Sequence, residues 1–181
     1  PIKRIGWWTS TMKVPYIDSN NVNHRPIVSV VCNLKKPSEE GYPCLLSLDD
    51  VKGIFHEFGH ALHIIFCQAR YASQYSENVD RDFFELPSQI NEHWSFEPEL
   101  LKEYAHHYKT GEQIPDNIIE ILQFLPNHNA GYKNIRIIST SYLDMKYGMI
   151  PNKDIDKIDI LKFEEEIRNE LCMPHEIDFL Y

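Results

Sequence analysis

The strongest constraint on the fold of this chain is an HExxH motif at residues 56–60, in the middle of a segment with helical periodicity. Side chains four positions apart project from the same face of an α-helix, so the imidazoles of His56 and His60 can reach one Zn²⁺. Glu57 is rotated by about 100° from His56, which suits a carboxylate that faces the metal-bound water and not the metal. The motif therefore predicts a zinc site on a helix.

The residues around the motif predict that this helix is amphipathic and packed. Asp49 and Asp50 are candidates to cap its first turn. An apolar stripe at spacings of three and four predicts its buried face; the stripe consists of Val51, Ile54, Phe55, Phe58, Leu62, Ile65 and Phe66. A metal site needs such a rigid element. The alternative is a pair of helix histidines that only hydrogen-bond in a core or face solvent.

Two histidines leave a catalytic zinc site one protein ligand short, because such sites usually combine three protein ligands with a water. His63 lies one turn after His60, but three imidazoles spread over about 10 Å of one helix cannot converge on one ion. We therefore expect His63 to pack against the site or to support it, and we expect the third ligand to come from another segment.

A carboxylate from a second helix is the better candidate, and the segment 82–88 offers Glu85. Pro87, which lacks an N–H, suits the first turn of a helix, so the chain is expected to become helical here. Two further carboxylates lie nearby, Asp82 and Glu92. Each is either part of an ordinary solvated face or a group that orients one of the motif histidines.

Longer motifs give the chain a family resemblance. HEFGHALH, followed by the Glu85 of RDFFELPSQINEHW, is similar to the thimet-oligopeptidase family of zinc metallopeptidases. PSQINEHW, GWW at 6–8, RPIVSVVCNLKKP, LLSLDDVKGIFHEFGH and YLDMKYG resemble its bacterial dipeptidyl carboxypeptidase branch more than its oligopeptidase branch. The resemblance implies one Zn²⁺ per chain, held by His56, His60 and Glu85. It also implies that Glu57 is the general base and proton shuttle, and that the enzyme releases dipeptides from the free C-termini of short peptides.

The resemblance also implies that the chain is a fragment. Chains of that family are several times longer and continue into a His/Gly/Tyr-rich motif that binds substrate and stabilises the oxyanion. This sequence begins at Pro1 without a Met and ends at Tyr181, short of that motif. We expect part of a catalytic domain, with the remainder of that domain and short peptides as partners, and little activity on its own. The alternatives are an endo-acting oligopeptidase and a zinc-binding piece that does not turn over.

Composition argues against other classes of function. The net charge of −9 disfavours binding to nucleic acid or to anionic membranes, which require clustered Lys and Arg. No apolar run approaches transmembrane length. The four cysteines are dispersed without a CxxC pair, so reduced thiols are expected. We expect a cytoplasmic protein, with a periplasmic parent protein as the alternative.

Along the chain, the pattern predicts a mainly α, zincin-like catalytic fragment with a small β element before the metal helix. Residues 1–49 form a β-containing lead-in, 50–109 hold the zinc-site helices, and 112–181 form a helical remainder. The β-branched run 27–34 predicts a strand, which is either purely structural or an edge strand that pairs with extended peptide. Further helices are expected at 99–109, 115–125, 132–147 and 159–171.

Overall fold

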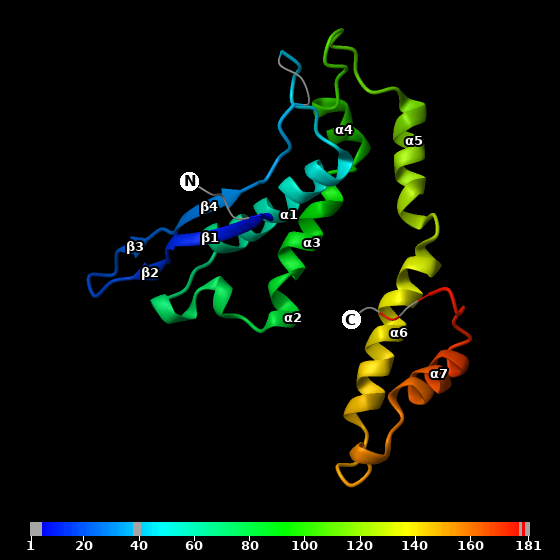
Figure 1. Cartoon of the computed structure of the whole chain (residues 1–181). Coiled ribbons are helices and arrows are strands. Elements are labelled where there is room, and N and C mark those ends of the chain that lie inside the picture. Colours follow the sequence, from blue (N-terminus) through cyan, green and yellow to red (C-terminus); the bar gives the residue numbers. More distant parts are fainter. Residues whose placement is uncertain (1–4, 38–40, 178, 180–181) are drawn as a thin grey trace. The chain divides into compact units, whose positions relative to one another are not determined.

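The computed structural model of the chain describes residues 5–37, 41–177 and 179. These residues divide between two compact units, Pro1–Glu120 and Ile121–Tyr181, whose elements are labelled in Figure 1. Helices dominate both units, and the described strands form only small two-stranded sheets in the first. The expected mainly α fold with a small β element is therefore confirmed. The ends of the sequence, on which the expectation of a fragment rests, lie outside the described residues.

The β element lies beside the helix that carries the HExxH motif. β1 (Trp8–Lys13) runs antiparallel to β4 (Ile27–Val31), and between them the chain forms a shorter ribbon of β2 (Tyr16–Ile17) and β3 (Asn23–His24). β1 and β4 both contact α1, and Figure 1 shows them lying along this helix. The strand expected at 27–34 is confirmed over five residues.

The HExxH helix, α1, spans Leu48–Ile65 and is capped by Ser47. The Ser47 hydroxyl accepts a hydrogen bond from the backbone N–H of Asp50, while the Asp50 carboxylate accepts one from the Ser47 N–H. This reciprocal pair is a capping box, which satisfies N–H groups that the first turn of a helix leaves without intrahelical partners. The expectation that Asp49 caps the helix is wrong, and Asp50 acts as the second half of the cap.

The buried side of α1 differs from the expected apolar stripe. Its buried residues are Glu57, Gly59, His60, Ala61 and Ile64. Three members of the stripe are instead exposed: Phe58 by 50%, Ile65 by 40% and Phe66 by 72%. The expectation is wrong for these three because periodicity shows only which side chains share a face. A face becomes buried where another element covers it, and in this unit α3 packs on the side that contains Gly59 and His60.

The acidic segment after α1 is helical, as expected. The 3-10 turns η1 (Ala72–Gln74) and η2 (Ser76–Asn78) lead into α2 (Arg81–Phe84) and α3 (Leu86–Trp94). Glu85 lies between α2 and α3, and Pro87 occupies the first turn of α3, where its missing N–H costs no hydrogen bond. The helix start expected near Pro87 is confirmed.

The helix expected at 99–109 is shorter than the sequence pattern indicates. α4 spans Pro98–Tyr104, and the backbone of Ala105 is extended. His106, expected on the helix, instead pairs with Gln113 in an isolated β-bridge. Gly111, at a φ of +74°, lies in the turn between them. Glycine there supports a left-handed turn residue and not a helix end, which is why the sequence signal was misleading.

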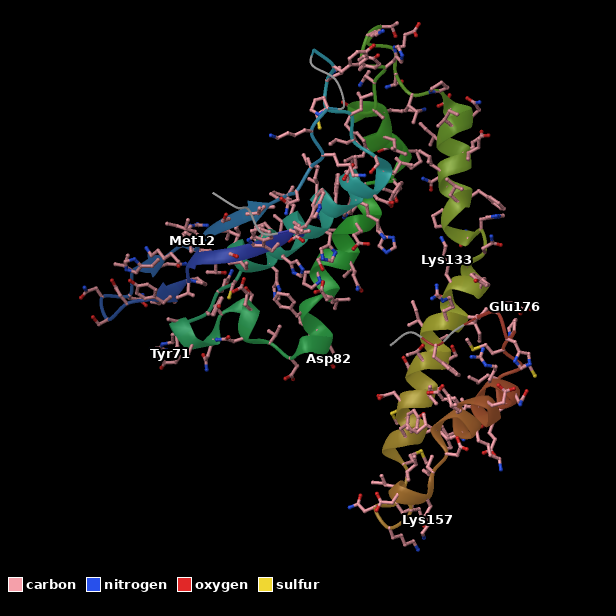
Figure 2. All side chains as sticks on the ribbon, in the orientation of Figure 1. Met12, Tyr71, Asp82, Lys133, Lys157 and Glu176 are labelled. Carbon is pink, nitrogen blue, oxygen red and sulfur yellow. The ribbon has the colours of Figure 1, made fainter. Side chains whose placement is uncertain are left out.

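The second unit is built on two packed helices, α6 (Ala130–Gly148) and α7 (Ile160–Glu170). The helix α5 (Asp116–Phe124) begins in the first unit and ends in the second, where the turn η3 (Leu125–Asn127) leads to α6. The turn η4 (Ile155–Lys157) leads to α7. These helices match the three expected at 115–125, 132–147 and 159–171. The turn between α6 and α7 contains Lys157 (Figure 2). The core of this unit consists of Leu143, Ile167, Met173, Ile177 and Phe179.

Two expectations from composition can be compared with the described residues. None of the helices in this part of the chain combines the length and the apolar character that crossing a bilayer requires. Cys44, Cys67 and Cys172 are not joined in disulfides, in line with the expectation of reduced thiols.

Candidate metal centre

The crossing of α1 and α3 brings the HExxH motif against the Glu85 segment. A Cβ atom built on Gly59 would lie 2.6 Å from the Cα of Ser88 and 2.8 Å from the carbonyl oxygen of Pro87. Such distances are below any normal van der Waals contact, so only glycine permits this approach. The Asn91 amide adds a hydrogen bond of 2.6 Å to the carbonyl of Phe55 across the same crossing. The small residue inside the motif therefore sets the distance between the two helices.

Three donor atoms converge at this crossing. Glu85 Oε2 lies 3.3 Å from His56 Nε2 and 3.2 Å from His60 Nε2. The ligand atoms of the three residues all lie within 4.8 Å of one another. Among the described residues, this is the group of His, Cys, Asp and Glu side chains that could hold a metal ion. The sequence-predicted residues His56, His60 and Glu85 are thus brought together by the fold.

The spacing of these atoms fits a tetrahedral ion. Ligand bonds of 2.0–2.2 Å in tetrahedral geometry separate neighbouring donor atoms by about 3.3–3.6 Å. The two distances from Glu85 to the histidine nitrogens, 3.2 and 3.3 Å, lie close to the lower end of this range. Two imidazoles and one carboxylate also form a donor set that catalytic zinc uses. The residues present therefore fit a zinc ion with one position left for water or substrate.

His56 is held from behind by Glu92. The Glu92 carboxylate lies 2.6 Å from His56 Nδ1, the ring nitrogen that does not face Glu85. Lys52, one helical turn before His56, lies 2.9 Å from the other oxygen of Glu92. Burial alone would raise the pKa of Glu92, but the hydrogen bonds from Lys52 and His56 hold that pKa below its usual range. A charged carboxylate at Nδ1 leaves Nε2 free for the metal and fixes the ring orientation. Of the two interpretations considered for Glu92, the geometry favours the group that orients a motif histidine.

His60 is held by packing instead. Its ring stacks on Phe84 with centroids 4.7 Å apart and meets the His56 ring edge-on at 4.9 Å. Its Nδ1 is buried, and within the described part of the chain it has no hydrogen-bond partner. The residue is only 7% exposed. The two motif histidines are therefore oriented by different means, one by a carboxylate and the other by an aromatic ring.

The Glu85 carboxylate is oriented by the helix that follows it. Ser88 is fully buried and donates from its hydroxyl to Glu85 Oε2 at 2.9 Å. The same hydroxyl lies 2.8 Å from the Glu85 carbonyl oxygen. The Glu85 side chain stays 46% exposed on its other side. A single serine three positions along the chain thus directs Glu85 towards the histidines.

Glu57 lies apart from the three donors, as the motif predicts. It is only 6% exposed, and its carboxylate is not part of the group that could hold a metal ion. Thr9 of β1 donates to Glu57 Oε2 at 2.9 Å. Neither Thr9 nor Lys52 was among the predicted site residues. Lys52 could have been found from its position four residues before His56 on the same face, whereas no sequence signal links Thr9 to Glu57, 48 positions away.

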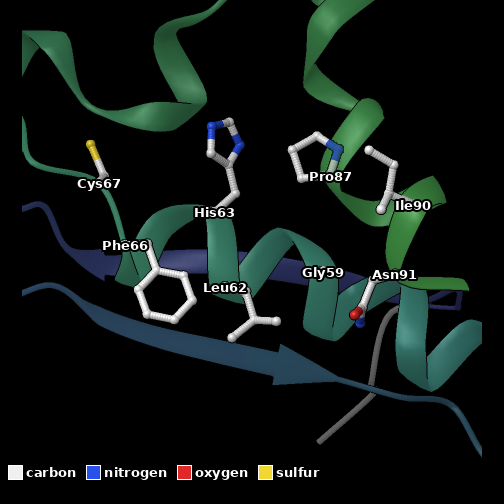
Figure 3. Close-up of a pocket in the computed structure, with 8 residues that line it drawn as sticks. All are labelled: Gly59, Leu62, His63, Phe66, Cys67, Pro87, Ile90 and Asn91. Atoms are coloured by element: carbon white, nitrogen blue, oxygen red, sulfur yellow. The ribbon is translucent and has the colours of Figure 1, made fainter. Parts of the chain in front are cut away.

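His63 does not belong to the group of three donors. Its ring approaches Phe83 with centroids 6.2 Å apart. It lines an open hollow of about 450 Å³ together with Gly59, Leu62, Phe66, Cys67, Pro87, Ile90 and Asn91 (Figure 3). Burial lowers the pKa of the His63 imidazole. This hollow flanks the α1–α3 crossing but contains none of the three donors. The geometry agrees with the expectation that His63 packs near the site without being a ligand.

Comparison with known proteins places the chain in a family. The chain matches the family described as Peptidase family M3 over residues 3–176. The chain belongs to peptidase family M3. The family resemblance drawn from the sequence motifs is therefore confirmed.

Individual members of family M3 show the same relationship. The chain is 35% identical over 161 residues to the dipeptidyl carboxypeptidase of Escherichia coli (strain K12), an alignment that covers 88% of this chain and 24% of the relative. It is 38% identical over 152 residues to the dipeptidyl carboxypeptidase of Salmonella typhimurium (strain LT2), covering 83% of this chain and 22% of the relative. Oligopeptidase A of Escherichia coli is 31% identical over 145 residues, with coverages of 80% and 21%. The chain spans between a fifth and a quarter of these relatives.

Proposed function

We propose that the protein is part of a zinc-dependent peptidase, in which His56, His60 and Glu85 hold one Zn²⁺ and Glu57 is the general base. The observation that carries the proposal is the position of Glu85 Oε2, 3.3 and 3.2 Å from the two motif histidine nitrogens. Membership of peptidase family M3 supports the same assignment. In this proposal the zinc-site segment 50–109 follows the β-containing lead-in 1–49 and precedes the helical remainder 112–181, although α1 itself already begins at Leu48.

In the proposed mechanism, Glu57, Glu92 and Ser88 have different roles in hydrolysis. Zinc, when bound, supplies Lewis acidity that favours ionisation of water and polarises the scissile carbonyl. Glu57 takes a proton from the attacking water on its carboxylate and passes it to the leaving amine; a positioned acid or base of this kind typically contributes about 10²–10⁴-fold. Glu92 keeps the Nε2 of His56 directed at the ion, and Ser88 does the same for Glu85 Oε2.

The substrates we propose are short peptides with free C-termini, from which dipeptides are released. The relatives named dipeptidyl carboxypeptidase support this preference. Similarity to oligopeptidase A supports the alternative of cleavage within the peptide. A labelled peptide of six to ten residues separates the two by its products, since sequential release from the C-terminus yields only dipeptides and a shortening remainder.

The role of Glu57 is tested with Glu57→Gln in the full-length protein loaded with zinc. Glutamine keeps the shape of the side chain but cannot accept the proton. We expect hydrolysis to fall by about 10²-fold or more while bound zinc, measured by metal analysis, stays at one per chain. Cleavage at a near wild-type rate would remove the mechanism, and loss of zinc would show that Glu57 is a ligand.

The ligand role of Glu85 is tested by zinc titration of Glu85→Gln. We expect affinity to weaken by at least tenfold with the fold intact by circular dichroism, because an amide replaces an anionic donor. Asp82→Asn is the matched control: it removes an exposed carboxylate from the same segment, and its zinc affinity should equal that of the wild type. Unchanged affinity in Glu85→Gln would place the third ligand elsewhere.

A second candidate function, zinc binding without turnover, is favoured for residues 1–181 on their own by the openness of the site. The Glu85 side chain is 46% exposed. Phe58 on α1 and Phe66, directly after this helix, remain 50% and 72% exposed. Hydrolysis also needs donors for the developing oxyanion, each worth about 10²–10³ in rate. The test is to offer short peptides to the purified, zinc-loaded 181-residue chain. Efficient, chelator-sensitive dipeptide release would refute this second candidate.

A further inference from the structure

β1 packs along α1 so that two residues of the strand advance about as far as one turn of the helix. Trp7, directly before β1, lies against Gly53, where a Cβ atom would come within 3.1 Å of the indole ring. Thr9 lies two residues after Trp7, and it contacts Glu57, which lies four residues after Gly53 on α1. Two residues of strand advance about 6.7 Å and four residues of helix about 6.0 Å. Alternate strand side chains therefore meet successive turns of the helix, and the close contact at Gly53 determines that Thr9 falls opposite Glu57.

The Thr9 hydroxyl contacts two oxygens of Glu57, one on its carboxylate and one on its backbone carbonyl. The Thr9 hydroxyl lies 2.9 Å from Glu57 Oε2 and 2.8 Å from the Glu57 carbonyl oxygen. A threonine hydroxyl has one hydrogen, which the two oxygens share or compete for. Glu57 is 6% exposed, so a carboxylate oxygen that lost this partner would be buried without compensation, which is costly.

We propose that Thr9 is a positioning residue for Glu57: its hydroxyl holds Oε2 in place, so that the other carboxylate oxygen is left for the attacking water. The inference rests on the proposed function, since it assigns a purpose to the orientation of the general base. A base that acts through one oxygen needs the other one anchored, because small misplacements of a reacting group carry large rate penalties.

The kinetic test uses the full-length, zinc-loaded protein with three substitutions in β1. Thr9→Val keeps the β-branched shape and removes the hydroxyl; we expect kcat to fall about tenfold, a part of the 10²–10⁴-fold that a positioned base contributes, with KM and zinc content unchanged. Thr9→Ser restores the hydroxyl and should recover most of kcat. Thr11→Val is the matched control, because the Thr11 hydroxyl is buried and has no hydrogen-bond partner among the described residues; its kcat should equal that of the wild type.

A second measurement does not depend on activity and separates the two acceptors. Thr9→Val is made in the wild type and in Glu57→Ala, and the shift of the urea unfolding midpoint is compared. Glu57→Ala removes the carboxylate but keeps the backbone carbonyl. If the hydroxyl serves the carboxylate, the shift caused by Thr9→Val should be at least halved in the Glu57→Ala background.

The outcomes distinguish this inference from the proposed function. A wild-type kcat for Thr9→Val, or an equal midpoint shift in both backgrounds, overturns the role of Thr9 and leaves the role of Glu57 standing. A Glu57→Gln enzyme that still hydrolyses peptides at a near wild-type rate overturns the proposed function, whatever the shift measured for Thr9→Val. A fall in kcat for Thr11→Val equal to that for Thr9→Val would show that β1 acts only as a structural support, and would also overturn the inference.

Discussion

Each unit of the molecule is built around one long helix, α1 with 18 residues in the first and α6 with 19 in the second, but of these two helices α1 alone buries ionisable side chains. α1 buries Glu57 beside Thr9 of β1 and His60 beside α3, together with Ala61 and Ile64. The buried residues of α6 are Ser139 and Leu143. Beside α7, the core around α6 is apolar, with Leu143 and Ile167 at its centre. Its polar contacts, such as those of Glu170 with Tyr142 and Lys146, lie at the exposed edge.

The difference shows where this chain accepts an energetic cost. Burying a polar group without full compensation is unfavourable. The buried hydroxyl of Ser139 on α6 avoids this cost by donating to the carbonyl oxygen of Arg136 on the same helix. α1 instead buries the carboxylate of Glu57 and the imidazole of His60, one of whose nitrogens has no partner among the described residues. Such a concentration of buried ionisable groups on one helix is typical of a functional site.

The largest expected effect comes from a substitution in the apolar core between α6 and α7. Leu143 is 2% exposed, and Leu143→Ala should lower the free energy of unfolding of the second unit by about 3 kcal/mol through lost burial and a cavity. Zinc affinity should not change, because the three donors lie in the first unit. Ile138→Ala, at a position of the same helix that is 58% exposed, is the control. Urea unfolding and zinc titration of both variants measure the two effects, and a loss of zinc affinity in Leu143→Ala would show that the units depend on one another.

Replacing a glycine in each long helix, Gly59 in α1 and Gly131 in α6, tests how closely each helix is packed at that position. Gly59→Ala places a Cβ 2.6 Å from the Cα of Ser88, and we expect a loss of about 2 kcal/mol from overpacking, with weaker zinc binding as α3 is displaced. Gly131→Ala in α6 has open space around its Cβ and should be neutral or stabilising by up to about 1 kcal/mol. Equal unfolding midpoints for the two variants would contradict the close packing described for the α1–α3 crossing.

Glu92 and Glu170 both have lowered pKa values, but we propose that Glu92 orients a metal ligand, whereas Glu170 only makes contacts at the surface. Glu92→Gln removes the charge behind His56, and zinc affinity should fall by about tenfold, at the low end for groups that support a metal ligand. Glu170→Gln removes a carboxylate whose pKa is lowered by its hydrogen bond from Tyr142, but it should leave zinc affinity unchanged and stability nearly so. Isothermal titration calorimetry with zinc measures both. Equal affinities would reduce Glu92 to a solvated surface residue.

The smallest effect concerns the cap of α1. The hydrogen bonds from Ser47 hold the pKa of Asp50 below its ordinary value. The folded state therefore favours the charged form, so the contribution of Asp50 is present at neutral pH and declines as pH falls below about 4 towards the lowered pKa of the folded state. Asp50→Asn should melt slightly earlier than the wild type at pH 7, and the difference should be smaller at pH 3. Asp49→Asn, which removes the same charge from the same turn outside the cap, controls for net charge; a difference at pH 3 as large as that at pH 7 would contradict the assignment.

Much of the fold and of the candidate site follows from local patterns. The helices around His56 and Pro87, the strand at 27–34 and the mainly α character are confirmed, as is the family. The spacing of His56 and His60 on one helical face is a property of the helix itself, and no other element is needed to predict it. The roles of the three donors and of Glu57 stay predictions until metal content and hydrolysis are measured.

The rest was decided by tertiary contacts. Periodicity predicted that Phe58 and Phe66 are buried, yet they are exposed, because the face of α1 that α3 covers is the one that contains Gly59. The partner of Glu57 comes from a strand 48 positions earlier. By itself, the sequence determined which side chains share a face, since that depends on backbone geometry within a few residues. Only the tertiary structure decided which faces are covered and which groups meet across them, since both depend on how distant segments pack.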